Sequence, residues 1–326
     1  MAASSRPVIT VLSSPGESAP PGIEAIKARA EVRFACDEAS LRETLPGTDA
    51  MMVTDFRTEA LEAAWGSADR LQWIHATSAG VDALMFPALI DSKVTVTNAR
   101  GIFDRTIAEY VLCTILMFAK DFPTSIRLQI NNQWQHRDTE RAEGKQVLVV
   151  GAGSIGRQIA RLVNAIGLNA HGIARTPRPD DPDFVAVHGN DELYEQLSHA
   201  DYVVIAAPLT PQTEGLFDAR AFAAMKSTAR LINIGRGPIV NTDALLQALD
   251  KGDIAGAGLD VFEEEPLPPE HPLWARENVI MTAHMAGDFI GWKRALTDQF
   301  LENFDRWHKG EELFNFVNKG LGYAGN

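Results

Sequence analysis

The chain has 326 residues, which is long for one domain and comfortable for two. A hydrophobic fraction of 45% and a charged fraction of 22% are ordinary for globular proteins and argue against a disordered or fibrous chain. Because 43 acidic residues outnumber 30 basic ones, the net charge of -13 disfavours nucleic acid and anionic membranes as partners.

The sequence carries no signal for a membrane or for a disulfide framework. No stretch reaches 18 consecutive apolar residues, and the strand-like segment Val8–Leu12 is too short for the core of a signal peptide. We therefore expect a cytoplasmic protein without a membrane partner. The two cysteines, Cys36 and Cys113, lack the spacing of a metal site, so we expect two buried structural thiols and no metal.

In the first hundred residues, short β-rich segments alternate with helical patterns. A helix is expected at Ile23–Ala30. The predicted strands are Val8–Leu12, Ala50–Thr54, Leu71–Thr77 and Val94–Asn98. Alternation of this kind is typical of βαβ units around a parallel sheet.

A long helical pattern at Arg105–Phe118 separates this region from a second, denser series of strands. These predicted strands are Val147–Val150, Ala170–Ala174, Tyr202–Ala207, Ala229–Ile234, Gly258–Val261 and Val279–Thr282. They are almost continuously apolar, as expected of strands that helices cover on both faces. A final helix is expected at Ile290–Trp307. The pattern predicts an α/β protein with two Rossmann-like, doubly wound parallel-sheet domains.

A glycine-rich turn follows the predicted strand Val147–Val150. Residues 151–156 read Gly-Ala-Gly-Ser-Ile-Gly, and a helical pattern continues from there. The glycines let the turn close and let backbone N–H groups approach a pyrophosphate. A glycine turn that is merely structural is the alternative. The strand-turn-helix context favours a dinucleotide site, whose predicted residues are Gly151, Gly153, Ser154, Ile155 and Gly156.

The tip of the next strand indicates which dinucleotide binds. Enzymes that use NAD usually place Asp or Glu there to hold the ribose 2′-hydroxyl, whereas this chain has Ala174, followed by Arg175, Thr176 and Arg178. Guanidinium groups bind phosphate through charge-assisted hydrogen bonds. We therefore predict that NADP(H) is preferred, with NAD(H) as the alternative. A solvated loop arginine is the competing interpretation.

Three further segments follow strands of the second series, at the strand ends where open α/β sheets bind ligands. They contain Arg236, Glu265 and His284. Carbonyl reduction needs a cation to hold the substrate, an acid to protonate the oxygen and a carboxylate to orient that acid. Each residue alone could be structural: a turn residue, a loop charge or a packed histidine. Their joint occurrence indicates a catalytic site.

With these segments in place, the sequence resembles the D-isomer-specific 2-hydroxyacid dehydrogenase family over nearly its whole length, and glyoxylate/hydroxypyruvate reductases most of all. The matching motifs are Ser78–Asp82, Ile107–Tyr110, Gly144–Lys145, Ala207–Thr213, Asn233–Gly237, Leu259–Pro268 and His284–Gly287. The resemblance implies a flavodoxin-like substrate domain of residues 1–99 and 288–326, and a dinucleotide-binding domain of residues 100–287. It also implies a homodimer in which Arg105–Phe118 and the stretch through Trp134 pack against a second subunit.

The resemblance implies roles for individual residues as well. Arg236 would anchor the substrate, His284 would be the acid/base, and Glu265 would be its partner. Further implied positions are Ala79, Gly80 and Val81 for the substrate carboxylate, Ile234 and Asp260 for the nicotinamide carboxamide, and Pro208 and Thr213 for the cofactor groove. The sequence departs from the family at Ala283, where proline commonly precedes the histidine.

The expected activity is reduction of small 2-keto acids, such as glyoxylate or hydroxypyruvate, to D-2-hydroxy acids. A formate- or phosphite-type dehydrogenase shares this scaffold, although formate dehydrogenases carry Gln at the position of Glu265. A nucleotide-sensing corepressor shares it too, but such proteins typically add recognition regions or long tails. Loops such as Asp55–Thr58, Met85–Phe86 and Met285–Trp292 would contact the side chain of the keto acid, and they do not identify it.

Overall fold

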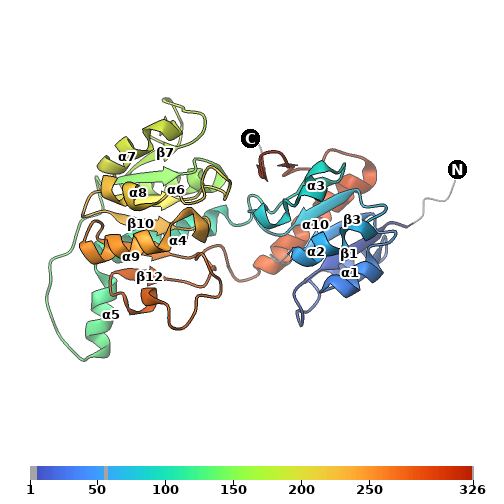
Figure 1. Cartoon of the computed structure of the whole chain (residues 1–326), viewed down its shortest axis with the longest axis horizontal. Helices are drawn as coiled ribbons and strands as arrows, with labels where there is room; N and C mark the ends of the chain where they lie inside the picture. The colour runs from blue at the N-terminus through green and yellow to red at the C-terminus, as the bar shows by residue number, and fades with distance from the viewer. Residues whose placement is uncertain (1–5, 55–57, 325–326) are drawn as a thin grey trace. The chain divides into compact units, whose positions relative to one another are not determined.

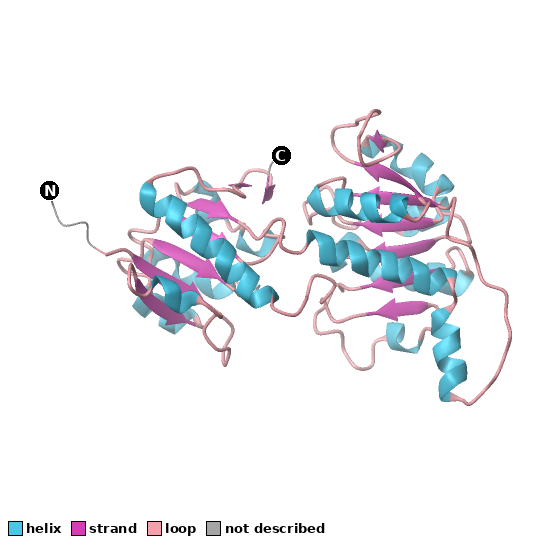
Figure 2. Cartoon of the chain, turned by 180° about the vertical axis from the view of Figure 1, so that it is seen from behind, coloured by secondary structure: helices cyan, strands magenta, loops and turns pink. Residues whose placement is uncertain are grey.

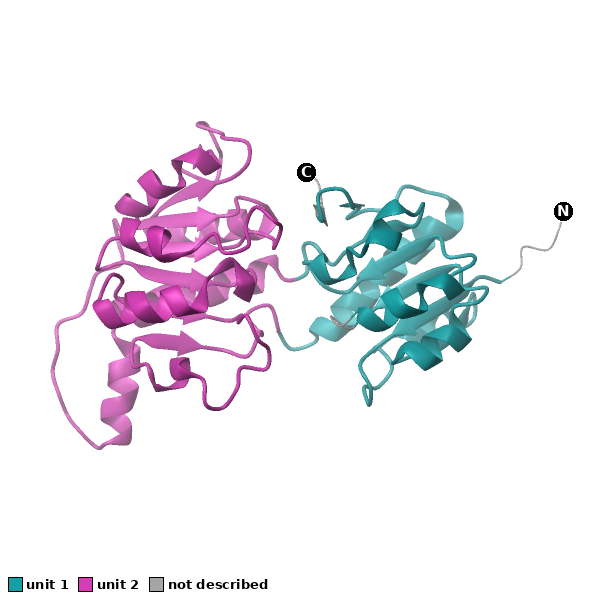
Figure 3. Cartoon of the chain, in the orientation of Figure 1, with its two compact units in different colours: residues 1–102, 289–326 teal, residues 103–288 magenta. Residues whose placement is uncertain are grey.

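The chain forms two compact units in this computed structural model, which describes residues 6–54 and 58–324. One unit comprises residues 1–102 and 289–326, and the other comprises residues 103–288 (Figure 3). The chain therefore leaves the first unit once and returns to it for its last segment.

The first unit is built on a five-stranded parallel sheet in the order β2-β1-β3-β4-β5, which is the flavodoxin-like order. Its strands are β1 (Val8–Leu12), β2 (Glu31–Ala35), β3 (Ala50–Val53), β4 (Trp73–Ala76) and β5 (Thr95–Thr97). Its helices are α1 (Glu38–Thr44), α2 (Glu59–Ala64), α3 (Pro87–Asp91) and α10 (Trp292–Lys309), with 3₁₀ turns η1 (Ile23–Ile26), η2 (Trp65–Ser67) and η3 (Asp82–Leu84). A short hairpin of β13 (Val317–Asn318) and β14 (Tyr323–Ala324) ends the described chain.

Helix α10 packs on the sheet of this first unit through aromatic side chains. The ring of Phe300 stacks on that of Trp73 in β4, with centroids 5.2 Å apart, and Phe304 joins the same buried cluster. Burying aromatic area of this kind is a main source of stability. The C-terminal segment is therefore an integral part of the N-terminal sheet.

The second unit is built on a seven-stranded parallel sheet in the order β12-β11-β10-β9-β6-β7-β8 (Figure 1). Its strands are β6 (Gln146–Val150), β7 (Asn169–Ile173), β8 (Val187–His188), β9 (Tyr202–Ile205), β10 (Arg230–Asn233), β11 (Gly256–Leu259) and β12 (Val279–Met281). Its helices are α4 (Asp104–Ala119), α5 (Phe122–Ile130), α6 (Ser154–Ala165), α7 (Leu193–His199), α8 (Ala219–Ala224) and α9 (Thr242–Lys251), with 3₁₀ turns η4 (Asn190–Glu192), η5 (Gly237–Ile239) and η6 (Pro272–Ala275).

The strands of the second unit are mostly apolar because helices cover both faces of the sheet (Figure 2). Along β6, Val147 and Val149 pack with α4 and α6 on one face. Leu148 and Val150 pack with α7, α8 and α9 on the other. The predicted fold class, two doubly wound parallel sheets, is confirmed.

Two local predictions are wrong. The helix expected at Ile23–Ala30 is only the 3₁₀ turn η1, because the chain goes directly into β2 at Glu31. This edge strand has Glu31 and Arg33 in place of an apolar run, so its pattern did not stand out.

Cys36 and Cys113 are exposed, not buried. Cys113 lies four residues after Glu109 on the outer face of α4, and Cys36 follows the end of β2.

Candidate active site

The glycine-rich turn between β6 and α6 has the shape that a pyrophosphate needs. Gly151 has a φ of 110°, and a Cβ there would lie 2.6 Å from the carbonyl of Ala206. A Cβ on Gly156 would lie 2.2 Å from the Gly151 oxygen. A Cβ on Gly153 would instead point into space that the described part of the chain leaves open. Gly151 and Gly156 thus pack against the backbone of the sheet and turn. Gly153 leaves open space next to the N-terminus of α6, which begins at Ser154.

The loop after β7 places its basic residues in two different environments. Ala174 follows the strand, and Arg175 and Thr176 are exposed. Arg178 is held: its Nε donates to Asp181 Oδ2 at 2.7 Å, and its Nη2 donates to the Ala152 carbonyl at 3.1 Å. Arg178 therefore ties this loop to the glycine-rich turn, whereas Arg175 lies on the solvent side.

Asp181 is the centre of this attachment, and its side chain is fully covered. Arg157 of α6 donates to both Asp181 oxygens at 2.9 Å, in the bidentate geometry that Arg–carboxylate pairs favour. Although burial raises the pKa of Asp181, hydrogen bonds from Arg178, the Asp183 N–H and Arg157 outweigh it and lower that pKa to about 2. No local sequence pattern indicates this role of Asp181, because its partner Arg157 is 24 positions away.

Arg236 lies in an extended segment after β10 and between two glycines that cannot be replaced. A Cβ on Gly237 would lie 1.9 Å from the carbonyl carbon of Phe262, and one on Gly235 would lie 2.8 Å from the Ala207 oxygen. The Arg236 segment therefore lies directly against the backbone that leads to Glu265. The guanidinium Nη1 donates to the Gly235 carbonyl at 2.9 Å.

Glu265 and His284 form a hydrogen-bonded pair in the loops that follow the carboxyl ends of β11 and β12. His284 Nδ1 lies 2.8 Å from Glu265 Oε2, and Glu265 Oε1 accepts the Phe262 N–H at 2.9 Å. Burial raises the pKa of Glu265, but the hydrogen bonds from His284 and Phe262 and the charges of His284 and Arg236 hold it below its usual value. The carboxylate is thus ionised at neutral pH. The structure brings Arg236, Glu265 and His284 together.

The backbone of His284 is in the left-handed region, with a φ of 50°, which is unfavourable for a residue with a side chain. Asp260 holds it there. The Asp260 carbonyl accepts the His284 N–H at 2.8 Å, and the Asp260 carboxylate accepts the N–H groups of Met285 and Ala286 at 2.9 Å. Asp260 is only 2% exposed, so this carboxylate fixes the loop that carries the histidine.

Other predicted cofactor positions lie at neighbouring strand ends. Ile234 follows β10, and its N–H donates to the Ile205 carbonyl. Pro208 is exposed after β9, and its carbonyl accepts the Thr213 hydroxyl at 2.7 Å. The same hydroxyl oxygen accepts the Thr210 N–H at 2.8 Å. The Thr213 side chain therefore joins the two ends of the loop formed by residues 208–213.

The segment predicted to hold the substrate carboxylate lies in the first unit, after β4. The carbonyls of Ser78, Ala79 and Gly80 accept hydrogen bonds from the Ala99 N–H, the Asn98 amide and the Ser78 hydroxyl, respectively. In a trans peptide the next N–H points opposite to the carbonyl. The N–H groups of Ala79, Gly80 and Val81 are therefore turned away from these partners. Of the loops expected to contact the keto-acid side chain, residues 55–57 lie outside the described residues.

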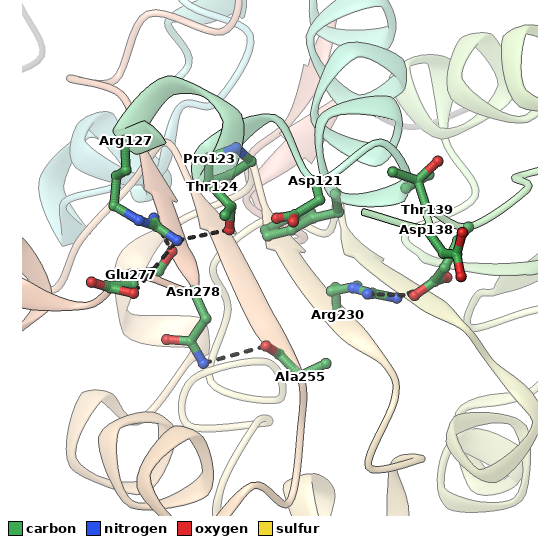
Figure 4. A pocket seen from close by; sticks show the side chains of 13 residues that line it. Asp121, Pro123, Thr124, Arg127, Asp138, Thr139, Arg230, Ala255, Glu277 and Asn278 are labelled. Atoms are coloured by element: carbon green, nitrogen blue, oxygen red, sulfur yellow. Dashed lines mark hydrogen bonds and ion pairs between the residues drawn. The ribbon is translucent and has the colours of Figure 1, made fainter. Parts of the chain in front are cut away.

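A cavity of about 600 Å³ in the second unit lies at the wrong edge of the sheet for this chemistry. Arg230, Ala255 and Asn278, which line it, stand at the amino ends of β10, β11 and β12 (Figure 4). Arg236, Glu265 and His284 follow the carboxyl ends of these strands.

Within the described ranges, no group of three or more metal-ligating side chains could hold a metal ion. No helix of the described chain is long and apolar enough to span a membrane.

Comparison with known proteins identifies the family. The family model described as D-isomer specific 2-hydroxyacid dehydrogenase, NAD binding domain, matches residues 112–286, which is more than half of the chain. The chain belongs to the D-isomer specific 2-hydroxyacid dehydrogenase family. It is an NAD(P)-dependent enzyme of this family, so the predicted family and enzyme class are confirmed.

Members of the family resemble the chain over most of its length. A glyoxylate reductase of Thermofilum pendens is 32% identical over 259 residues, which cover 78% of this chain and 76% of that protein. A solved D-isomer specific 2-hydroxyacid dehydrogenase from Xanthobacter autotrophicus Py2, in complex with NADPH and MES, is 30% identical with a TM-score of 0.83, covering 97% and 99%. An NADPH-dependent glyoxylate/hydroxypyruvate reductase from Sinorhizobium meliloti, in complex with NADP and sulfate, is 28% identical with the same TM-score and the same coverage.

Proposed function

We propose that the chain reduces small 2-keto acids, of the size of glyoxylate and hydroxypyruvate, to D-2-hydroxy acids with NADPH as hydride donor. The observation that carries this proposal is the 2.8 Å contact between His284 Nδ1 and Glu265 Oε2 next to the glycine-flanked Arg236. His284 supplies a proton, Glu265 supplies the negative charge that orients His284, and Arg236 supplies a cation that binds the substrate. Relatives named glyoxylate/hydroxypyruvate reductases support the choice of keto acid.

The roles follow from the donors on each side chain. Glu265 accepts from Nδ1 of His284, so the proton for the substrate is held on Nε2. Arg236 binds the substrate carboxylate and polarises the keto oxygen. Bound NADPH supplies the hydride that adds to the carbonyl carbon. The Nε2 proton goes to the carbonyl oxygen, which leaves a neutral histidine beside Glu265 and completes the alcohol.

The first unit is proposed as the substrate domain, because its peptide N–H groups at Ala79, Gly80 and Val81 point opposite to carbonyls that the chain's own donors already engage. Such N–H groups bind carboxylates well. The second unit is the dinucleotide-binding domain of the proposal, and its boundaries follow the division after Ile102 and after Asp288.

For the cofactor, we propose that the turn from Gly151 to Gly156 holds the pyrophosphate and that Arg175 pairs with the 2′-phosphate. Arg175 is exposed at the strand tip where Ala174 leaves no repelling carboxylate. Arg178 acts indirectly, since Asp181 and Ala152 hold it. Thr176 would bind the ribose. Complexes of relatives with NADPH and NADP support this preference.

The nicotinamide end of the cofactor would meet the strand ends that follow β9, β10 and β11. Its carboxamide would be held by Asp260 and by the backbone near Ile234. Asp260 Oδ1 already accepts from Thr282 and Met285. Asp260 Oδ2 accepts the Ala286 N–H, and a carboxylate oxygen has a second lone pair that can take one more N–H. Pro208 and Thr213 would line the groove.

We propose a homodimer that uses α4, α5 and the segment after α5. Phe122, Ile126 and Ile130 recur every four residues on α5, so they form one stripe, and all three are exposed. Trp134, four residues further on, is fully exposed in the single chain. An exposed apolar stripe of this kind marks a protein interface, and a second copy of the chain can bury it.

The experiment that tests the proposed reaction is a screen of NADPH oxidation with glyoxylate, hydroxypyruvate, pyruvate, phenylpyruvate and 2-ketoisocaproate, repeated with NADH. The reverse assay uses formate and phosphite with NADP⁺ and NAD⁺. We expect turnover with a small keto acid and, for every substrate except glyoxylate, whose product glycolate is achiral, a product of the D configuration by chiral chromatography. Turnover with formate or phosphite alone, or an L product, would contradict the proposal.

A further inference from the structure

The motif Ile107–Tyr110 in α4 has no part in the proposed reaction, yet Tyr110 reaches the loop that carries His284. The Tyr110 hydroxyl lies 2.8 Å from Thr282 Oγ1. Thr282 is the first residue after β12 and stands two positions before His284. Tyr110 and Thr282 are 172 positions apart, so only the fold brings them together.

The protons of this contact can be assigned. Thr282 Oγ1 also lies 2.6 Å from Asp260 Oδ1. A threonine hydroxyl has one proton, and a carboxylate cannot donate. The Thr282 proton therefore points to Asp260, and Tyr110 donates to Thr282. Burial raises the pKa of Tyr110, so its hydroxyl keeps the proton that this chain of hydrogen bonds requires.

Asp260 is the last member of the chain of hydrogen bonds, and it holds the strained backbone of the histidine. Its carboxylate accepts Met285 N–H and Ala286 N–H as well as the Thr282 hydroxyl, and its carbonyl accepts His284 N–H. A residue with a side chain keeps a positive φ only where several contacts fix it. Of these four contacts, the one with Thr282 is connected to α4, because Thr282 also contacts Tyr110.

We propose that Tyr110 is a positioning residue for His284, acting through Thr282 and the carboxylate of Asp260. This inference rests on the proposed function, in which His284 is the proton donor. Without the Tyr110 hydroxyl, Thr282 loses its donor and is free to rotate away from Asp260, and the loop from Thr282 to Ala286 is held less firmly. Chemistry slows because the imidazole is displaced from the carbonyl oxygen, while the glycine-rich turn that holds the pyrophosphate of the cofactor stays in place.

The test uses Tyr110→Phe, which removes only the hydroxyl, and Tyr202→Phe as its control. Tyr202 is a fully buried tyrosine of the same unit, and its hydroxyl has no hydrogen-bond partner within the described ranges. With the best keto acid, we expect Tyr110→Phe to lower kcat about fivefold, the effect of one neutral hydrogen bond. KM for NADPH and its dissociation constant from NADPH fluorescence should stay within about twofold of wild type. Tyr202→Phe should leave kcat unchanged.

A second pair of variants makes the test independent of how Tyr110→Phe folds. Thr282→Ser keeps the hydroxyl and should retain wild-type kcat, whereas Thr282→Val should lose at least as much as Tyr110→Phe. The double variant, which combines Thr282→Val with Tyr110→Phe, should have a kcat no lower than that of Thr282→Val alone, because both changes break the same chain of hydrogen bonds.

The outcomes separate this inference from the proposed function. If His284→Ala keeps its turnover, the proposed function fails. If His284→Ala is inactive while Tyr110→Phe and Thr282→Val keep wild-type kcat, the positioning role of Tyr110 is wrong. Equal losses of kcat in Tyr110→Phe and Tyr202→Phe would also overturn it, since they would show a general effect of removing a buried hydroxyl.

Discussion

Replacing Asp181 by Asn should destabilise the second unit by an amount that depends on pH. The change keeps the shape of the side chain and removes the charge that Arg157 and Arg178 share. The pKa of Asp181 falls from 3.8 to about 2 in the folded chain. Since one pKa unit corresponds to about 1.4 kcal/mol, the ionised carboxylate contributes about 2 kcal/mol to the free energy of unfolding. The two arginines are partly exposed, so screening by solvent makes this an upper value.

The sign of the pH dependence follows from the direction of the shift. A carboxylate whose folded pKa is depressed contributes its full stability above the unfolded pKa of 3.8. That contribution is lost as the pH falls through about 2. Wild type and Asp181→Asn should therefore differ most at about pH 7, and the difference should narrow between about pH 4 and pH 2.

The assay is urea unfolding at pH 7 and at pH 3, followed by circular dichroism. Asp250→Asn is the matched control, because Asp250 also pairs with an arginine, Arg276, but is mostly exposed. Asp250→Asn should lower the free energy of unfolding clearly less than Asp181→Asn does. Because Arg178 also donates to the Ala152 carbonyl in the glycine-rich turn, Asp181→Asn should weaken NADPH and NADH binding by the same factor. A loss of stability that is equal at both pH values, or no loss at pH 7, would show that the charge of Asp181 does not stabilise the fold.

Three further predictions concern the cofactor, the acid/base pair and the assembly. Arg175→Ala should reduce a wild-type preference for NADPH of about tenfold in kcat/KM to near equality; wild-type preference for NADH, or no change in the variant, would reject Arg175 as the phosphate ligand. Glu265→Gln should lower kcat roughly ten- to a hundredfold, because a charged hydrogen bond to His284 is lost; unchanged stopped-flow turnover would remove Glu265 from the site. Ile126→Asp should convert a dimer into a monomer in light scattering at micromolar concentration, and a monomeric wild type would remove the proposed dimer.

The sequence predicted those parts whose signal is local. The turn from Gly151 to Gly156 could be found because its strand, glycines and helix are contiguous, and the apolar strands show the doubly wound sheet directly. Arg236, Glu265 and His284 could be found as candidates because each follows a predicted strand. Their spatial relation was implied only by the resemblance to the family, since it depends on how the strand ends converge.

What the sequence did not predict depends on contacts between distant residues. Arg178 stands between two prolines in a polar loop, and no local pattern shows that Asp181 and Ala152 engage its guanidinium. The link from Tyr110 to Thr282 spans 172 positions. The strand Glu31–Ala35 was missed because an edge strand is polar on its open side, and so has no continuous apolar run.

The most direct test of the central claim is the single-turnover rate of NADPH oxidation by His284→Gln with the best keto acid, alongside its dissociation constant for NADPH. We expect a rate lower by about 10²–10⁴-fold, because a positioned proton donor has been removed, with cofactor affinity within about twofold of wild type. A variant that binds NADPH normally and reduces the keto acid at the wild-type rate would contradict the assignment of His284 as the acid.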